Sequence, residues 1–152
     1  PDGNALAVAI QSDLRRVGIE AKIVTYDWGT YLEKTKNGQH DMAMLGWSAD
    51  FADPDNFLYY LLSKSSAKKP AGNIAFYRSD EMQSVLDRAR VETKMEIRTQ
   101  LYKEAQSLFH RDVPWVPLAH AKQIVVAQKN VRRLKLHPTS FKYLRNVEIS
   151  ND

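Results

Sequence analysis

The segment Gly46–Phe57, GWSADFADPDNF, joins two kinds of predicted structure. The apolar run that leads into it, residues 41–47, is short and predicts a buried strand. Residues 48–54 predict a polar turn, and residues 55–62 an aromatic-rich helix whose N-terminal acceptor would be Asp55 or Asn56. Because α/β proteins tend to bind ligands just beyond strand ends, this acidic turn is the first place to expect a binding site.

The chain before this segment alternates between helical and strand patterns. Apolar residues recur every three or four positions in a helix that Asn4 would cap and Gly18 would end. Residues 19–26 are rich in β-branched side chains and predict a strand. Asp27 would cap a second helix, which Gly38 closes. The order helix, strand, helix, strand predicts an α/β layer with parallel pairing.

Two longer helices are predicted after residue 79. Ser79 would cap the first, and a capping box of Thr93 and Glu96 would start the second. Each carries an apolar stripe at helical spacing: Met82, Val85, Leu86 and Ala89 in the first, and Ile97, Leu101, Ala105 and Leu108 in the second. Pro114 stops the helical pattern. Strand signals follow at residues 115–120, 123–128, 134–136 and 147–149.

Composition excludes several classes of protein. The chain has 152 residues, 43% of them hydrophobic and 26% charged, which fits one globular domain with a real core. It has no cysteine, so disulfides, thiolate metal sites and thiol nucleophiles are excluded. No apolar run is long enough to span a membrane. The net charge of +4 does not require nucleic acid, and the Lys and Arg clusters are interpreted as solvated faces.

The acidic turn offers more than one chemistry. Asp50, Asp53 and Asp55 could hold calcium, but the glycine and terminal Glu of an EF-hand loop are missing, and caps and turns explain Asp53 and Asp55 at least as well. Asp50 differs because Trp47 lies three residues before it. A carboxylate beside an aromatic face suits a ligand ammonium. The histidines lack zinc-ligand spacing, and no phosphate-binding or nucleophile motif is present.

Four stretches together carry a resemblance to a known family. They are residues 21–29 (AKIVTYDWG), residues 46–57, the helix segment 101–106 (LYKEAQ) and residues 114–120. They resemble the C-terminal part of periplasmic dipeptide-binding proteins of ABC importers, within the oligopeptide-type solute-binding family 5. The resemblance implies the C-terminal lobe of a type II periplasmic binding protein, an α/β fold with a mixed sheet flanked by helices. Because family members are much longer, we expect this chain to be a fragment, with Pro1 at a cut.

The resemblance also implies a site and a division of the chain. Residues 1–125 would form the lobe, with a half-site near 46–56, and residues 126–152 would cross back to the missing N-terminal lobe. Asp50 would bind the α-ammonium of a peptide and Trp47 would form a pocket wall. The main chain of Gly46 and Ser48 would pair with the extended peptide.

A function follows as an expectation from this resemblance. The protein would capture dipeptides or short oligopeptides outside the cytoplasm, in the periplasm or at the membrane, and deliver them to ABC permease subunits. No catalytic residue, cofactor, metal or nucleic-acid partner is implied. Two alternatives stay open: a relative on the same scaffold that binds haem or antimicrobial peptides, and a hydrolase that uses Asp50 and Asp53 as an acid/base pair.

Overall fold

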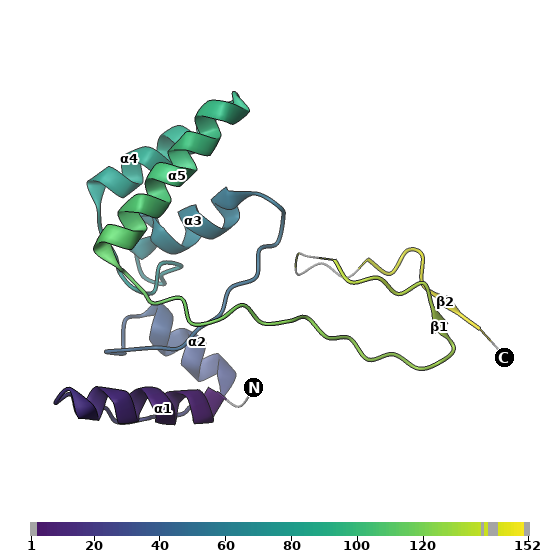
Figure 1. The fold of residues 1–152 in the computed structure, drawn as a ribbon, viewed down its shortest axis with the longest axis horizontal. Helices are drawn as coiled ribbons and strands as arrows, with labels where there is room; N and C mark the ends of the chain where they lie inside the picture. Colours follow the sequence, from purple (N-terminus) through teal and green to yellow (C-terminus); the bar gives the residue numbers. More distant parts are fainter. Residues whose placement is uncertain (1–2, 138, 140–142, 151–152) are drawn as a thin grey trace.

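A computed structural model describes residues 3–137, 139 and 143–150. The elements in chain order are α1 (Gly3–Arg16), α2 (Trp28–Lys36), α3 (Pro54–Leu62), the 3-10 helix η1 (Ser65–Ala67), α4 (Asp80–Val91), α5 (Met95–Asp112), β1 (Val131–Arg132) and β2 (Glu148–Ile149). Helices α3, α4 and α5 gather in one cluster, and α1 and α2 lie together below it (Figure 1). After α5 the chain leaves the helices as a long extended segment.

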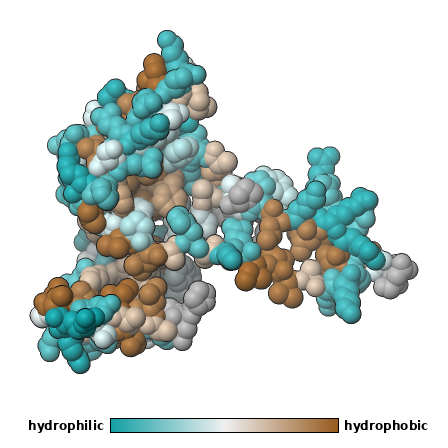
Figure 2. Space-filling view, viewed as in Figure 1, coloured by the Kyte–Doolittle hydropathy of each residue, from teal (hydrophilic) through white to brown (hydrophobic). Residues whose placement is uncertain are grey.

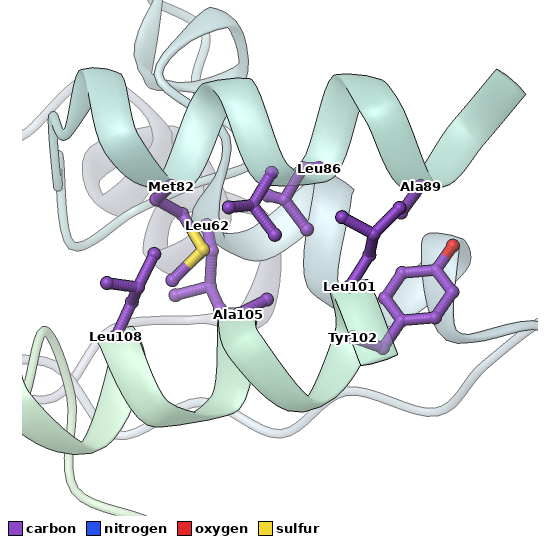
Figure 3. Close-up of a cluster of buried hydrophobic side chains, with 9 residues drawn as sticks. Leu62, Met82, Leu86, Ala89, Leu101, Tyr102, Ala105 and Leu108 are labelled. Carbon is purple, nitrogen blue, oxygen red and sulfur yellow. The ribbon is translucent and has the colours of Figure 1, made fainter. Parts of the chain in front are cut away.

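The core lies where α4 and α5 pack on each other and on the end of α3. Its buried side chains are Leu62, Met82, Val85, Leu86, Ala89, Leu101, Tyr102, Ala105 and Leu108. Figure 3 shows the α4 members facing the α5 members, with Leu62 between them. The two apolar stripes expected from the sequence are therefore confirmed, except at Ile97, which is 44% exposed on α5.

Several predicted helix ends are confirmed. The Asp27 carboxylate accepts a hydrogen bond from the Thr30 N–H (3.0 Å), and the Ser79 hydroxyl accepts one from the Met82 N–H (3.1 Å). Gly18 follows α1 with φ of 84°, and Gly38 follows α2 with φ of 67°. Glycine adopts such left-handed backbone without steric cost, which ends a helix cleanly.

Three other helix-start predictions are wrong. Asn4 lies inside α1, which already begins at Gly3. The cap of α3 is Asp53 and not Asp55 or Asn56, because Pro54 occupies the first helical position, where its fixed φ suits a helix start. The capping box of Thr93 does not form: Lys94 is the N-cap of α5 and has no side-chain capping bond.

Glu92 replaces that capping box at the start of α5. Its carboxylate accepts the Lys94 N–H at 2.7 Å. This hydrogen bond between a side chain and the backbone two residues later fixes the connection between α4 and α5.

The strand predictions for 19–26, 41–47, 115–120, 123–128 and 134–136 are wrong, because none of these segments belongs to a sheet. Within the described residues the sheet is a two-stranded antiparallel pair, with Val131 opposite Ile149 and Arg132 opposite Glu148. A strand needs a hydrogen-bonded neighbour as well as suitable side chains. Side chains of the helices reach two of these segments instead: Gln11 donates to the Ala21 carbonyl (2.7 Å), and the Tyr31 hydroxyl to that of Met44 (2.8 Å).

The burial expected for these segments is also partly wrong. Met42 is 62% exposed and Leu45 is 39% exposed, so the run 41–47 is not a buried strand. The apolar residues at the ends of the first predicted helical stripe are also exposed: Leu6, in α1, is 42% exposed, and Val17, which directly follows α1, is 71% exposed.

The chain separates from the helices just after α5. Val113 ends α5 in the left-handed region (φ of 44°), and Trp115 still packs against Phe109, with ring centroids 4.6 Å apart. The arm that follows, residues 116–130, is exposed almost throughout and leads to β1. Figure 2 shows apolar side chains gathered on this part of the chain beyond α5.

In the part of the chain that the structure describes, no helix combines the length and the apolar character needed to cross a membrane.

Candidate ligand-binding site

The predicted site residues lie on the connection between α2 and α3. Trp47 stacks on Tyr60 of α3, with ring centroids 4.5 Å apart and planes 23° from parallel. The Trp47 Nε1 is buried and donates to no atom of the described residues. The position of this indole is therefore set by ring stacking and packing and not by a hydrogen bond.

Tyr60 rests on the backbone of Gly72. A Cβ atom at position 72 would lie 2.7 Å from the Tyr60 Cζ and 2.8 Å from its Cε2, closer than side-chain atoms can approach. Gly72 thus leaves the space that the Tyr60 ring fills. Trp47, Tyr60 and Gly72 form a continuous stack from the predicted site to the loop after η1.

An apolar pocket of about 230 Å³ opens beside this stack. Its walls include Trp28 and Leu32 of α2, Leu45 and Trp47 of the connection, Tyr60, and Ile74. Gly46 also lines it, whereas Ser48 and Asp50 do not. The structure therefore brings two of the four predicted residues into one pocket and leaves the other two on the adjoining turn.

Sequence reasoning missed most of this pocket. The spacing of Trp28 and Leu32 places them on one face of α2, a signal that was available. Tyr60 and Gly72 carried no usable signal, because their role depends on contacts between separate segments.

The turn that carries Asp50 is held by hydrogen bonds within the turn and to the first turn of α3. The Asp50 N–H donates to the Asn56 Oδ1 at 3.0 Å. The Asp53 N–H donates to the Phe51 carbonyl at 2.9 Å, and the Asn56 N–H to the Asp53 carbonyl at 3.2 Å. Residue Asp50 itself is exposed to solvent. The first turn of α3 thus fixes the backbone next to that carboxylate.

Asp53 has a structural role on two elements. Its Oδ1 accepts the Asp55 N–H at 2.8 Å, which caps α3. Both of its carboxylate oxygens also accept from the Arg98 guanidinium of α5, each at 2.8 Å. These hydrogen bonds from Arg98 hold the pKa of the Asp53 carboxyl below its ordinary value, against a smaller opposing effect of burial.

Asp55 forms an ion pair with Arg90 of α4. The Arg90 Nε of α4 lies 3.2 Å from the Asp55 Oδ1, and the Arg90 guanidinium sits 4.1 Å from the centre of the Tyr59 ring. The cap-and-turn interpretation is therefore confirmed for Asp53, which caps α3, whereas Asp55 lies within the first turn of α3 and pairs with Arg90. Among the described residues, no three His, Asp or Glu side chains are grouped so that they could hold a metal ion.

Comparison with known proteins places this fold. In a solved complex of a Pseudoalteromonas dipeptide-binding protein with Met-Leu, the matching part is 34% identical, with a TM-score of 0.88, covering 96% of this chain and 29% of that one. The fold is that of a type II periplasmic binding protein, which confirms the fold class expected from the sequence.

The family follows from two further matches. The family model described as bacterial extracellular solute-binding proteins, family 5 Middle, matches residues 1–69. A Pseudomonas aeruginosa di/tripeptide-binding protein is 37% identical over 151 residues, 98% of this chain. The chain belongs to family 5 of the bacterial extracellular solute-binding proteins.

The relatives differ from this chain in length and from one another in the ligands they are named for. The chain spans 28% of the length of that Pseudomonas relative. A heme-binding protein of Haemophilus influenzae is also similar, at 36% identity over 121 residues, 80% of this chain and 22% of the relative. Proteins similar to this chain are thus named for different ligands.

Proposed function

We propose that the protein is the extracytoplasmic solute-binding component of an ABC importer that captures dipeptides or short oligopeptides. The observation that carries the proposal is the arrangement of residues 46–50. A carboxylate, Asp50, stands on a fixed turn directly after a stretch that borders an apolar pocket. Relatives along nearly the whole chain are named as dipeptide- and di/tripeptide-binding proteins.

The backbone of Gly46, Trp47 and Ser48 suits an extended peptide. Within the described residues, these three make no backbone hydrogen bond to another segment. An added strand can therefore pair with them, which supplies affinity without reading side chains. That mode fits ligands of variable sequence.

The Asp50 carboxylate and the neighbouring pocket would then bind the N-terminal end of the peptide. An α-ammonium that leaves water on binding needs a counter-charge, and Asp50 supplies it. The pocket walled by Trp47 and Tyr60 would take one apolar side chain of the peptide. Together these features select a free N-terminus and tolerate different residues beside it.

The remaining parts of the proposal concern the whole protein. Residues 1–125 would belong to the C-terminal lobe, and residues 126–152 would cross back to an N-terminal lobe that closes over the ligand. The closed form would deliver the peptide to the permease from the periplasm. The protein would act by binding and not as an enzyme. The two hydrogen bonds from Arg98, which lower the pKa of Asp53, count against Asp53 as the general acid of the hydrolase alternative.

A second candidate is haem binding on the same scaffold. The Haemophilus relative, at 36% identity, is the observation that favours it. Titration of the full-length protein with haemin would then produce a shifted Soret band at stoichiometric haem, which the peptide-binding proposal does not expect.

Calorimetric titration tests the peptide proposal. The full-length protein is titrated with Met-Leu and with N-acetyl-Met-Leu, alongside an Asp50→Ala variant. Loss of one partner of a buried, hydrogen-bonded charge pair costs about 2–5 kcal/mol, so Kd should rise about 30- to 5,000-fold. Acetylation of the ligand should have an effect of similar size.

Asp13→Ala serves as the matched control, since it removes an exposed carboxylate from α1, far along the chain from the turn. It should leave Kd unchanged. If Met-Leu does not bind, or if Asp50→Ala binds it as well as the natural protein, the proposed role of Asp50 is wrong.

A further inference from the structure

We infer that Arg98 is a positioning residue for the ligand site: through Asp53 it holds the turn that places Asp50 against the peptide ammonium. The inference rests on the proposed function and deepens it. Arg98 lies on α5, 45 residues beyond Asp53 in the sequence. It would act on the ligand without touching it.

Arg98 is itself held firmly in the helical cluster. Its side chain is only 18% exposed, and its Nε donates to the Ala89 carbonyl at 2.9 Å, near the end of α4. Its Nη2 donates to the Tyr102 hydroxyl at 2.7 Å, one turn further along α5. The guanidinium therefore has a fixed orientation before it meets Asp53.

The contact with Asp53 transmits that orientation to the turn. Both carboxylate oxygens of Asp53 accept from Arg98, a two-point contact that fixes distance and angle together. The same carboxylate caps α3 through the Asp55 N–H. Arg98 thus fixes the start of α3 on α5.

The last step runs from α3 to Asp50. Asn56 lies in the first turn of α3, and its side-chain oxygen accepts the Asp50 N–H. A shift of the α3 start moves Asn56 and with it the backbone of Asp50. A charge-assisted hydrogen bond to an ammonium is sensitive to such displacement, because its geometry is narrow.

A purely structural role would give a different result. If Arg98 only stabilised the fold, its loss would lower stability and leave the affinity of the folded protein unchanged, or would weaken binding regardless of the group at position 50. A positioning role requires that the effect of Arg98 depend on the Asp50 carboxylate. A double-mutant cycle separates the two.

The cycle combines Arg98→Met with Asp50→Asn in the full-length protein, with Met-Leu as the titrated ligand. Methionine keeps apolar packing in place of the arginine stem and removes the guanidinium. With Asp50 present, Arg98→Met should raise Kd about tenfold, a typical coupling within one hydrogen-bonded network. With Asn at position 50, the same change should shift Kd by less than about twofold.

Two further variants keep the test decisive. Asp53→Asn retains a side-chain oxygen for the α3 cap and removes the ion pair, so it should reproduce the effect of Arg98→Met even if that variant folds poorly. Arg111→Met is the control on the same helix: Arg111 pairs with Glu81 and Asp112 and makes no contact with Asp53. It should leave Kd unchanged.

The outcomes distinguish the two levels of the argument. If Asp50→Asn leaves Kd unchanged, the proposed role of Asp50 in binding the ligand ammonium fails and the role of Arg98 fails with it. If Asp50→Asn weakens binding but Arg98→Met and Asp53→Asn do not, or weaken it equally with Asn at position 50, only the positioning role is overturned.

Discussion

Replacement of Gly72 by alanine tests whether the aromatic stack beside the site depends on a single missing side chain. The new Cβ would lie 2.7, 2.8 and 3.0 Å from three carbons of the Tyr60 ring. Gly72 is not among the positive-φ glycines, so alanine fits its backbone and the clash is the main perturbation. Either the Tyr60 ring stays in place and the contact with residue 72 is overpacked, or the ring turns away from Trp47.

Both responses cost free energy of similar size. Overpacking by one methyl group costs about 1–3 kcal/mol. Rotation of Tyr60, which is 38% exposed, avoids the clash but gives up the stack on Trp47, worth about 0.5–1.5 kcal/mol beyond the area buried. We therefore expect Gly72→Ala to lower the free energy of unfolding by about 1–2 kcal/mol.

Urea unfolding measures this change, and near-ultraviolet circular dichroism of the folded variant reports on the aromatic packing. The matched control is Gly46→Ala, where a Cβ would meet nothing within 4 Å. It should leave stability and the aromatic signal nearly unchanged. If Gly72→Ala is as stable as Gly46→Ala and has the same aromatic spectrum, the contact between Gly72 and Tyr60 does not hold the stack.

Two further predictions concern the helical cluster. Leu86→Ala should lower the free energy of unfolding by about 2–5 kcal/mol, because Leu86 is 1% exposed at the centre of the core; a urea midpoint equal to that of the natural protein would refute this. The pKa of Asp53 lies below its ordinary 3.8, so the folded state binds fewer protons there than the unfolded state. The stability that Arg98 gives through Asp53 is therefore complete above the ordinary pKa and is lost as the pH falls through the folded pKa. Urea midpoints should fall more steeply below about pH 4 in the natural protein than in Asp53→Asn, and parallel curves would contradict the argument.

The sequence predicted the helices well because their signals are local. The apolar stripes of α4 and α5 lie within one helix each, and both were buried as expected at Met82 and Leu101. The caps at Asp27 and Ser79 depend on a residue and the N–H three positions later. The resemblance also identified the fold class before any geometry was known.

The strands were mispredicted for the opposite reason. Residues 19–26 have the side chains of a strand, but a ladder also needs a neighbouring strand, and no pattern within the segment says which one. The prediction of how the helix at Met95 is capped was wrong for a different reason. Thr93 and Glu96 have the spacing of a capping box, yet Glu92 makes the competing bond to the Lys94 N–H.

The candidate site could be predicted only in outline. The position of Asp50 and Trp47 followed from a motif of twelve residues, Gly46–Phe57. The contacts that hold the Asp50 turn in place could not be predicted, because the contact between Asp53 and Arg98 joins residues 45 positions apart. Nothing in either local sequence distinguishes this pair from other pairs of opposite charge.

The arm, residues 116–130, bears on how this chain must be handled. Ile124 is 82% exposed and Val126 is 91% exposed, and residues 114–127 have no hydrogen bond to any other described residue. An extended β-branched segment with free N–H and C=O groups is a template on which other chains add as strands. Wherever nothing covers the arm, increasing protein concentration will drive aggregation, and charged substitutions at positions 124 and 126 are the direct way to suppress it.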